Sequence, residues 1–547
     1  MIPFSKAVFD AICRKKAHPE SPVFEKLDIK APAMHKFMDM DLMLVESADI
    51  EKLAARAFYD IQFKLDTELA LWLADAAAAS TAGSPEKRVL EQLLENAKIS
   101  ARGIYPMCQD SGTAIVYAWK GSNIFVKGDE QAAMENGARS AWERGRFRNS
   151  QILPIGKLEE KNSGNNLPVS IKIFSEGSDK YLFLFCAKGG GSANKTRLFQ
   201  ETKAVLRPDA MASFIKKAVD SIGVSACPPY RIALAIGGQS PEESVMAANL
   251  ASYGALDALP VRAEPGGSPY RDRELEAVCL EAARNSGWGA QFGGIYMARD
   301  ARVIMLPRHA ASLPIAIAVS CIAHRKAFAY ISKDGCFLEK LASEQELESI
   351  TQKNAGQKSC PKTESIKLEL GRYGGDKLKK AIARLKAGNM IELWGQVVLA
   401  RDAVHARLLS MLKKAEPLPD WAYLPVFYAA PTEALPGRAS GSLGPTTSRR
   451  MDSYLLDFAQ HGVFPVSIGK GERAAECAEV YKKHGGAYLA TVGGAAAIAA
   501  ERYVKASAII DWPELGMEAV RIVELSGLPC MVIMDSHGGN YYEALQK

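Results

Sequence analysis

The sequence predicts an α/β protein of two domains, with a larger N-terminal domain and a smaller C-terminal one. Its 547 residues are enough for two or more domains that each bury a core. Apolar runs with helical spacing alternate with short strand-like runs that lead into glycine-rich turns. A polar stretch from Ser343 to Glu364 has no clear periodicity, and it marks the expected domain boundary.

The first part of the chain predicts helices followed by alternating strands and helices. Residues 50–100 contain ADIEKLAARAFYDIQFKL and ELALWLADAAAA, in which apolar residues recur every three or four positions. The runs KYLFLFCA (180–187) and YRIALAIGG (230–238) predict strands, and DAMASFIKKAVDSIG predicts a helix between them.

The part beyond the polar stretch predicts a second α/β or β-rich unit. The segment NMIELWGQVVLARDAVHARLLSML predicts a strand, a turn and a helix. Further short strands are predicted by the runs YLPVFYAAP, VFPVSIGKG, GAYLATVGG and LPCMVIMD. This unit would hold about 180 residues, which is a normal size for a domain.

The composition is typical of a soluble globular protein, with 48% hydrophobic and 24% charged residues. The net charge of +6 includes no long basic run, so it argues against nucleic-acid binding but suits an anionic substrate. No apolar stretch is long enough to span a bilayer, and the start has no secretory signal. Ten cysteines in this length favour reduced thiols in a cytosol-like compartment.

Three cysteines in distant glycine- or proline-flanked segments are the most informative chemical feature. Cys108 lies in PMCQDSGT, Cys227 in SACPPY and Cys321 in VSCIA, and none belongs to a C-x-x-C pair. Zinc knuckles and thioredoxin-type redox pairs are therefore disfavoured. Three thiolates from distant loops suit a [4Fe–4S] cluster with one iron open to substrate oxygen, which predicts a hydration catalyst rather than an electron carrier.

Two further segments of the first domain could take part in the same site. Gln109 and Asp110 follow Cys108, and Asp110 could steer a proton or a water there. The turn AKGGGSANKT (187–196) follows a predicted strand, and its glycines let backbone N–H groups approach an anion. The alternatives are a buried structural cysteine beside an Asx-turn and a flexible turn.

The remaining candidate residues are cations and hydroxyls at predicted turns. In GSLGPTTSRRMD (441–452) two hydroxyls follow a rigid Gly-Pro turn, and Arg450 could bind a carboxylate with both guanidinium nitrogens. Lys470 lies between two glycines, and Arg401 lies between a strand and a helix. His309, in LPRHA, could donate to a substrate carboxylate. Each of these also fits a solvated charge or a structural histidine.

Together these segments resemble the class I, iron–sulfur-dependent fumarate hydratases. The matching strings follow the family's order from about residue 50 to 540: CQDSGTA, NLP, AKGGGSANKT, ACPPY, GAQFGG, LPRHAAS, GSLGPTTSRRMDSY, GKG, KKHGGAYL and PELGMEA. The resemblance implies a hydro-lyase of the tricarboxylic acid cycle that interconverts fumarate and (S)-malate. It also implies a homodimer in the cytoplasm, or in the mitochondrion if a eukaryotic N-terminus is cleaved.

By motif, the resemblance assigns Cys108, Cys227 and Cys321 as the ligands of a [4Fe–4S] cluster whose unique iron acts as a Lewis acid. Thr446 would be the base that removes the C3 proton, with help from Asp110. The dicarboxylate site would be lined by Gln109, Arg148, Gly190, His309, Arg401, Arg450 and Lys470.

The resemblance also implies how the chain is divided. An N-terminal extension (1–45) would precede the α/β iron–sulfur-cluster domain (46–345). A linker (346–365) would lead to a C-terminal swivelling domain (366–547). Closure of the second domain onto the first would assemble the site, because the cysteines lie on one and most cations on the other.

One departure from the family pattern leaves the preferred diacid open. Ser448 and Arg449 stand before Arg450, where the family generally has a small Ala-Gly pair. The alternatives are a related hydro-lyase for L-tartrate or mesaconate, a cluster-bearing redox sensor without catalysis, and an α/β protein with scattered buried cysteines. The fusion of both halves favours the fumarate enzyme over the tartrate enzymes, whose halves are usually separate chains. Thr446, Arg450 and Lys470 favour an enzyme over a sensor.

Overall fold

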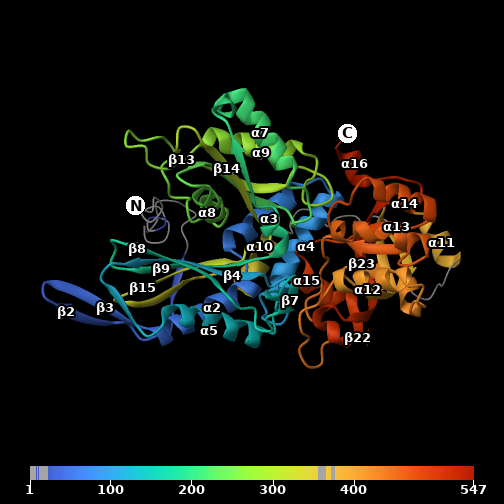
Figure 1. Cartoon of the computed structure of the whole chain (residues 1–547), viewed down its shortest axis with the longest axis horizontal. Coiled ribbons are helices and arrows are strands. Elements are labelled where there is room, and N and C mark those ends of the chain that lie inside the picture. Colours follow the sequence, from blue (N-terminus) through green and yellow to red (C-terminus); the bar gives the residue numbers. More distant parts are fainter. Residues whose placement is uncertain (1–7, 9, 11–22, 355–364, 371–375, 547) are drawn as a thin grey trace.

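The computed structural model describes residues 8, 10, 23–354, 365–370 and 376–546. Its strands form three large sheets of six, five and seven strands and two small ones. The seven-stranded sheet and its helices, drawn in orange and red, lie beside the part that holds the other two large sheets (Figure 1). The predicted mixed α/β fold is therefore confirmed. In the described ranges, no helix has both the length and the apolar character that crossing a membrane requires.

The six-stranded sheet is stacked between two helices and the second sheet. Its central strand β9 (Tyr181–Lys188) is buried along its whole length. Phe183 and Phe185 face the core that contains helices α2 (Ser47–Phe63) and α5 (Glu130–Gly145). Leu182 and Leu184 face the opposite core, which is shared with the five-stranded sheet. In spatial order the other strands are β1 (Phe24–Lys26), β16 (Gly335–Glu339), β15 (Lys326–Ser332), then β9, β4 (Thr113–Gly121) and β8 (Ser170–Glu176).

The five-stranded sheet carries helices on its two faces. Its central strand β11 (Tyr230–Gly238) is fully buried, as the apolar run predicted. Helix α8 (Pro241–Ser252) shares the core between the two sheets, whereas α7 (Pro208–Asp220) and α9 (Arg273–Asn285) pack on the other side. The other strands are β10 (Arg197–Glu201), β14 (Leu313–Ser320), β13 (Ala298–Arg308) and β12 (Tyr270–Arg271).

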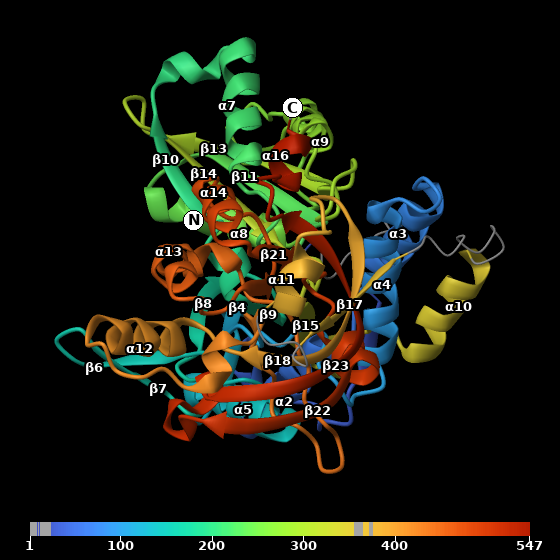
Figure 2. The ribbon, with the colours of Figure 1, turned by 90° about the vertical axis from the view of Figure 1, so that its right-hand side faces the viewer.

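The seven-stranded sheet closes on itself. Its strands are β17 (Ile366–Leu370), β18 (Met390–Leu399), β19 (Val426–Phe427), β20 (Val466–Gly469), β21 (Ala487–Ala490), β22 (Val504–Asp511) and the long β23 (Val520–Met534). Strand β18 pairs with β19 and also, antiparallel, with β23, so β18, β19, β20, β21 and β23 form a ring. β22 runs beside β23 in the view of Figure 2. The helices are α11 (Asp376–Ile382), α12 (Asp402–Lys413), α13 (Asp452–Gln460), α14 (Glu476–His484), α15 (Ala496–Ile498) and α16 (Tyr541–Leu545).

The helical prediction for residues 50–100 is confirmed by α2, α3 (Thr67–Ala79) and α4 (Pro85–Ser100). The side chains of Asp66 and Ser84 accept backbone hydrogen bonds at the starts of α3 and α4, as N-cap residues do. Small sheets are formed by β2 (Ala33–Phe37), β3 (Met40–Glu46) and β5 (Ile124–Lys127), and by β6 (Ile152–Gly156) and β7 (Glu159–Asn162).

The predicted extension (1–45) and linker (346–365) fall partly outside the described residues. The described part of the predicted extension contains β1, β2 and most of β3. The described start of the predicted linker belongs to helix α10 (Glu344–Asn354), and β17 begins at Ile366. The bounds of the extension and of the linker stay predictions.

The C-terminal half is seated on the N-terminal half through buried polar contacts. The Asn96 amide on α4 donates to the carbonyls of Met107 and Gly494, both at 3.0 Å, and accepts from the N–H of Ile498 at 3.0 Å. Gln291 makes a matching pair of bonds with the backbone of Gly493, at 2.9 and 2.7 Å. One apolar core contains residues of both halves, so their relative placement is fixed by packing as well as by hydrogen bonds.

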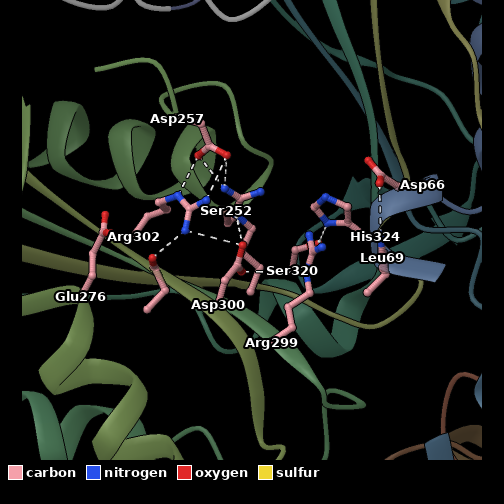
Figure 3. Close-up of polar contacts among 12 residues, drawn as sticks. Asp66, Leu69, Ser252, Asp257, Glu276, Arg299, Asp300, Arg302, Ser320 and His324 are labelled. Carbon is pink, nitrogen blue, oxygen red and sulfur yellow. Dashed lines mark hydrogen bonds and ion pairs between the residues drawn. The ribbon is translucent and has the colours of Figure 1, made fainter. Parts of the chain in front are cut away.

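An ionic network stabilises the five-stranded sheet (Figure 3). Asp257 pairs with Arg231 on β11 and, at 2.9 Å, with Arg302 on β13. Burial alone would raise the pKa of Asp257, but these two arginines hold it well below its usual range. At the end of β14 the Ser320 hydroxyl and Nδ1 of His324 lie 2.7 Å apart, which fixes the turn that begins at residue 321.

Replacement of Asn96 by alanine tests the polar contacts between the halves. Asn96→Ala would leave two carbonyls and one N–H buried without partners, so we expect a loss of roughly 2–4 kcal/mol in the free energy of unfolding. Urea unfolding followed by circular dichroism measures it. Asn136→Ala, which removes an exposed hydrogen bond on α5, is the control and should change little. Equal stabilities of the two variants would contradict this account.

Candidate active site

The three predicted cysteines meet at the surface between the two halves. Cys108 lies between α4 and β4, Cys227 between α7 and β11, and Cys321 directly after β14. The N–H of Ile322 donates to the Cys227 carbonyl at 3.1 Å, which joins the second and third loops. Burial raises the pKa of Cys227 to about 11, and the thiols of Cys321 and Cys108 contribute to that rise. All three thiols therefore share one electrostatic environment.

The Cys227 thiol is closely packed against a glycine turn of the C-terminal half. Cys227 itself has a left-handed backbone, with φ of 64°. Gly493, from the turn after β21, lies against it, because a Cβ on Gly493 would stand 2.5 Å from the Cys227 Sγ. No residue other than glycine fits at this position without displacing the thiol or the turn.

Lys470 reaches the thiols from the C-terminal half. Its Nζ donates to the Sγ of Cys227 at 2.8 Å. Burial alone would lower the pKa of Lys470, but the thiols, Cys227 first, raise it overall, so the ammonium form is favoured. The Lys470 N–H donates to the Thr446 carbonyl at 3.2 Å, and its own carbonyl accepts from Ser448 at 3.0 Å. The Gly-Lys-Gly turn is thus bound to the Gly-Pro-Thr-Thr turn.

Thr446 is placed in this second turn and is buried. Its N–H donates to the Tyr428 carbonyl at 2.6 Å. On either side of it, the Pro445 carbonyl accepts from the Gln109 amide at 3.2 Å, and the Thr447 hydroxyl donates to the Ser225 carbonyl at 3.4 Å. The turn therefore spans the loops of the first and second cysteines.

The structure also brings Asp110, Arg148 and Gly190 together. Asp110 accepts from the Gly190 N–H at 2.8 Å and lies 3.3 Å from Arg148 Nη2. Burial alone would raise the pKa of Asp110, but Arg148 and Arg325 lower it, so the side chain is a carboxylate at neutral pH. Gly190 opens the short helix α6 (Gly190–Ala193), the predicted anion-binding turn, and its N–H is here occupied by Asp110.

Two guanidinium groups near the site have unused donors. Among the described residues, Nη1 of Arg148 and Nε of Arg401 are buried without a hydrogen-bond partner. Arg401 is otherwise paired with Glu518, and the half-exposed Arg450 is paired with Asp402. Burial lowers the pKa of Arg148, and the nearby Arg401 and Arg450 lower it further. A small dianion would satisfy these donors and reduce their mutual repulsion.

His309 is the one predicted site residue that the structure does not place with the others. It lies exposed on the loop between β13 and β14, where its Nδ1 accepts from the Ala311 N–H at 3.2 Å. Arg308 donates to the carbonyl of His309 at 2.9 Å and so holds the loop. Its role in substrate binding stays a prediction.

Several residues that position the site were not predicted from the sequence. Arg325, four residues after Cys321, is buried beneath the Cys108 loop and donates to Gln62 at 2.9 Å. Glu518 holds Arg401 and comes from the matching string PELGMEA, which was the available signal. Gln291, from GAQFGG, donates to the Pro228 carbonyl at 3.1 Å and so fixes the turn after Cys227.

The donor set fits an iron–sulfur cluster better than a single metal ion. No trio of Cys, His, Asp or Glu side chains in the described ranges is close enough to hold one ion. A [4Fe–4S] cluster binds each thiolate on a different iron, so its ligands need not converge on one point. Three thiols that influence one another, with a cation in contact with one of them, are compatible with such a cluster.

The chain is similar to known fumarate hydratases over most of its length. The family model described as "Fumarate hydratase (Fumerase)" matches residues 51–330, and "Fumarase C-terminus" matches residues 335–545. "Fumarate hydratase class I, aerobic" of Salmonella typhimurium is 38% identical over 518 residues, which are 93% of this chain and 87% of that protein. "Fumarate hydratase 2" of Leishmania major is 40% identical over 90% of this chain and 86% of its own length. "Fumarate hydratase 1, mitochondrial" of the same organism is 38% identical over 92% of each chain.

The contact between Lys470 and Cys227 predicts a pH-dependent thiol reactivity. Burial raises the pKa of Cys227 to about 11, and the charge of Lys470 opposes that rise. Lys470→Met should therefore raise the pKa of Cys227 further and decrease the fraction of thiolate at any mildly alkaline pH. We expect iodoacetamide to modify Cys227 of the metal-free protein roughly tenfold more slowly, as measured by peptide mass spectrometry. Lys482→Met, on the exposed face of α14, is the control. An unchanged rate in Lys470→Met would show that the ammonium does not act on the thiol.

Proposed function

The chain belongs to the class I fumarate hydratase family, and we propose that it is the hydro-lyase that reversibly adds water to fumarate to give (S)-malate. The observation that carries the proposal is the meeting of three thiols with cations from both halves. Lys470 contacts Cys227, and the unused donors of Arg148 and Arg401 belong to the same group of charges. This arrangement suits a substrate with two carboxylates.

Cys108, Cys227 and Cys321 would hold a [4Fe–4S] cluster, which when bound supplies a Lewis-acidic iron that makes hydroxide a better leaving group. Because Gly493 has no side chain, no Cβ at this position displaces the Cys227 thiol that would bind the cluster. Lys470 and Arg325 supply positive charge beside the thiolates, which favours their ionised form. Gln109 follows the first ligand directly and is fixed by its bond to the Pro445 carbonyl.

The C3 proton of malate would pass to the hydroxyl of Thr446. A threonine hydroxyl is a weak base, so its neighbours must lower its effective pKa and accept the proton in turn. Asp110 could accept the proton from Thr446, because Arg148 and Arg325 hold Asp110 in the carboxylate form. The Lys470 ammonium on the adjacent turn would lower the effective pKa of the Thr446 hydroxyl. In the reverse direction the same groups would return the proton to fumarate.

The substrate carboxylates would be held by Arg148, Arg401 and Arg450. Fixed guanidinium donors also stabilise the charge that develops on a carboxylate when the C3 proton leaves. Because Arg148 comes from the first half and Arg401 and Arg450 from the second, one dicarboxylate would be bound by both halves. The polar contacts of Asn96 and Gln291 hold the two halves together.

The proposed assembly is a homodimer that acts on a small dicarboxylate in a cytosol-like compartment, without nucleic acid or membrane as a partner. Light scattering after size-exclusion chromatography tests the dimer. A mass of one chain would contradict it.

An anaerobic assay of the iron–sulfur-reconstituted protein tests the function. Loss of the fumarate double bond is followed by its ultraviolet absorbance, and the broad visible absorbance of the cluster is recorded on the same sample. Fumarate, L-tartrate and mesaconate are compared because Ser448 and Arg449 depart from the family pattern. We expect the highest kcat/KM for fumarate and malate. Preference for another diacid, or a cluster without turnover, would favour the related hydro-lyases or the redox sensor.

Replacement of Thr446 separates catalysis from cluster binding. Thr446→Ala should keep the cluster absorbance and reduce kcat by roughly 100-fold or more, because the proton acceptor is removed. Thr446→Ser should restore part of the activity. The neighbouring Thr447→Ala, which loses only the bond to Ser225, is the matched control. Full activity of Thr446→Ala would exclude the threonine as the base.

A further inference from the structure

A cavity of about 340 Å³ lies where three segments of the chain meet, and none of the predicted site residues lines it. Its walls come from the turn between α3 and α4, from the loop that follows α9 and from the C-terminal helix α16. The Tyr541 hydroxyl on α16 donates to the Phe292 carbonyl of the loop at 3.1 Å. A volume of this order suits a small organic molecule.

The side chain of Glu86, in the first turn of α4, lines this cavity and is only 7% exposed. Its Oε1 accepts from the backbone N–H groups of Ala290 and Tyr296, at 3.2 and 2.7 Å. These bonds fix the carboxylate against the loop, and a Cβ on Gly294 would stand 2.2 Å from its Cδ. Glu86 is therefore built into the wall of the cavity.

The second oxygen of Glu86 is left for a ligand. Among the described residues, none donates to Oε2, and no lysine, arginine or histidine pairs with Glu86. Oε2 is also not one of the atoms sealed from solvent, so it is open to the cavity. A largely buried carboxylate without a cation is costly, and a positively charged ligand would reduce that cost.

The other residues that line the cavity fit the apolar part of such a ligand. The aromatic residues Phe292, Tyr296 and Tyr541 line it, and aromatic rings attract cations as well as apolar groups. No basic side chain is among the described residues of its walls, so a carboxylate ligand would be repelled. Glu86 is the one carboxylate among them, whereas a divalent metal ion takes several oxygen ligands.

We propose that this cavity binds a small organic cation, with an ammonium or amidinium group on Oε2 of Glu86 and an apolar part among the aromatic residues. This site goes beyond the proposed function, because the substrate proposed there is a dianion. The cavity nevertheless adjoins the active site through one loop. Ala290 is bonded to Glu86, and the next residue, Gln291, binds the backbone of Pro228 and Gly493.

The test measures binding of benzylammonium, benzyl alcohol and benzoate to the full-length protein by isothermal titration calorimetry at neutral pH. The three probes share one ring and differ in charge. Glu86→Gln removes the charge but keeps an acceptor for the two N–H groups. Ala79→Phe, at an exposed position of the cavity wall, fills the cavity without touching Glu86. Glu91→Gln, on the exposed face of the same helix, is the matched control.

We expect benzylammonium to bind once per chain and at least tenfold more tightly than benzyl alcohol, with no binding of benzoate. Glu86→Gln should weaken benzylammonium binding roughly tenfold or more, Ala79→Phe should abolish it, and Glu91→Gln should leave it unchanged. Circular dichroism checks folding, and Ala79→Phe with the probe series decides the matter if Glu86→Gln does not fold.

Three results would overturn the inference: no binding of benzylammonium, equally tight binding of either other probe, or undiminished binding by Glu86→Gln or Ala79→Phe. The titration is made on the protein before and after iron–sulfur reconstitution. Because binding at Glu86 requires no cluster, this inference and the proposed function fail separately.

Discussion

The arrangement of the site depends on the contact between the Lys470 ammonium and the Cys227 thiol. It joins the two halves of the chain at 2.8 Å, in a place where the thiol is buried and the lysine is partly buried. A buried ammonium without an anion is costly, and a buried thiol resists ionisation, so each group is stabilised by the other. The turns that carry Thr446 and Lys470 are bound to one another by backbone hydrogen bonds, so this contact places the threonine as well.

The surrounding structure makes that contact possible by packing rather than by charge. The two stacked sheets fix the loops of the three cysteines, and the ring of strands in the C-terminal half fixes the turns that face them. The side chains of Asn96 and Gln291 bind backbone groups of the opposite half, so these contacts involve no second side chain. The chemistry is thereby divided: the thiols and the Asp110 carboxylate come from one half, and cations come from both halves. Such a division suits a reaction in which substrate binding completes the site.

The sequence predicted the elements with strong apolar patterns and the cysteine trio, because both are visible locally. The run at 180–187 is a strand buried on both faces, and its lack of polar alternation is the reason it could be identified. Asp110 was found because it adjoins Cys108. Arg325 and Gln62 were missed because their roles arise from tertiary contacts between segments that are distant in the sequence. His309, chosen by motif, lies on an exposed loop, and a single chain does not bring it to the other residues.

The most direct test of the account is anomalous X-ray scattering at the iron edge from crystals of the reconstituted protein grown with malate. The account predicts one iron site between Cys108, Cys227 and Cys321, with the malate carboxylates against the free donors of Arg148 and Arg401. Iron bound at any other set of residues, or malate bound away from these arginines, would contradict it.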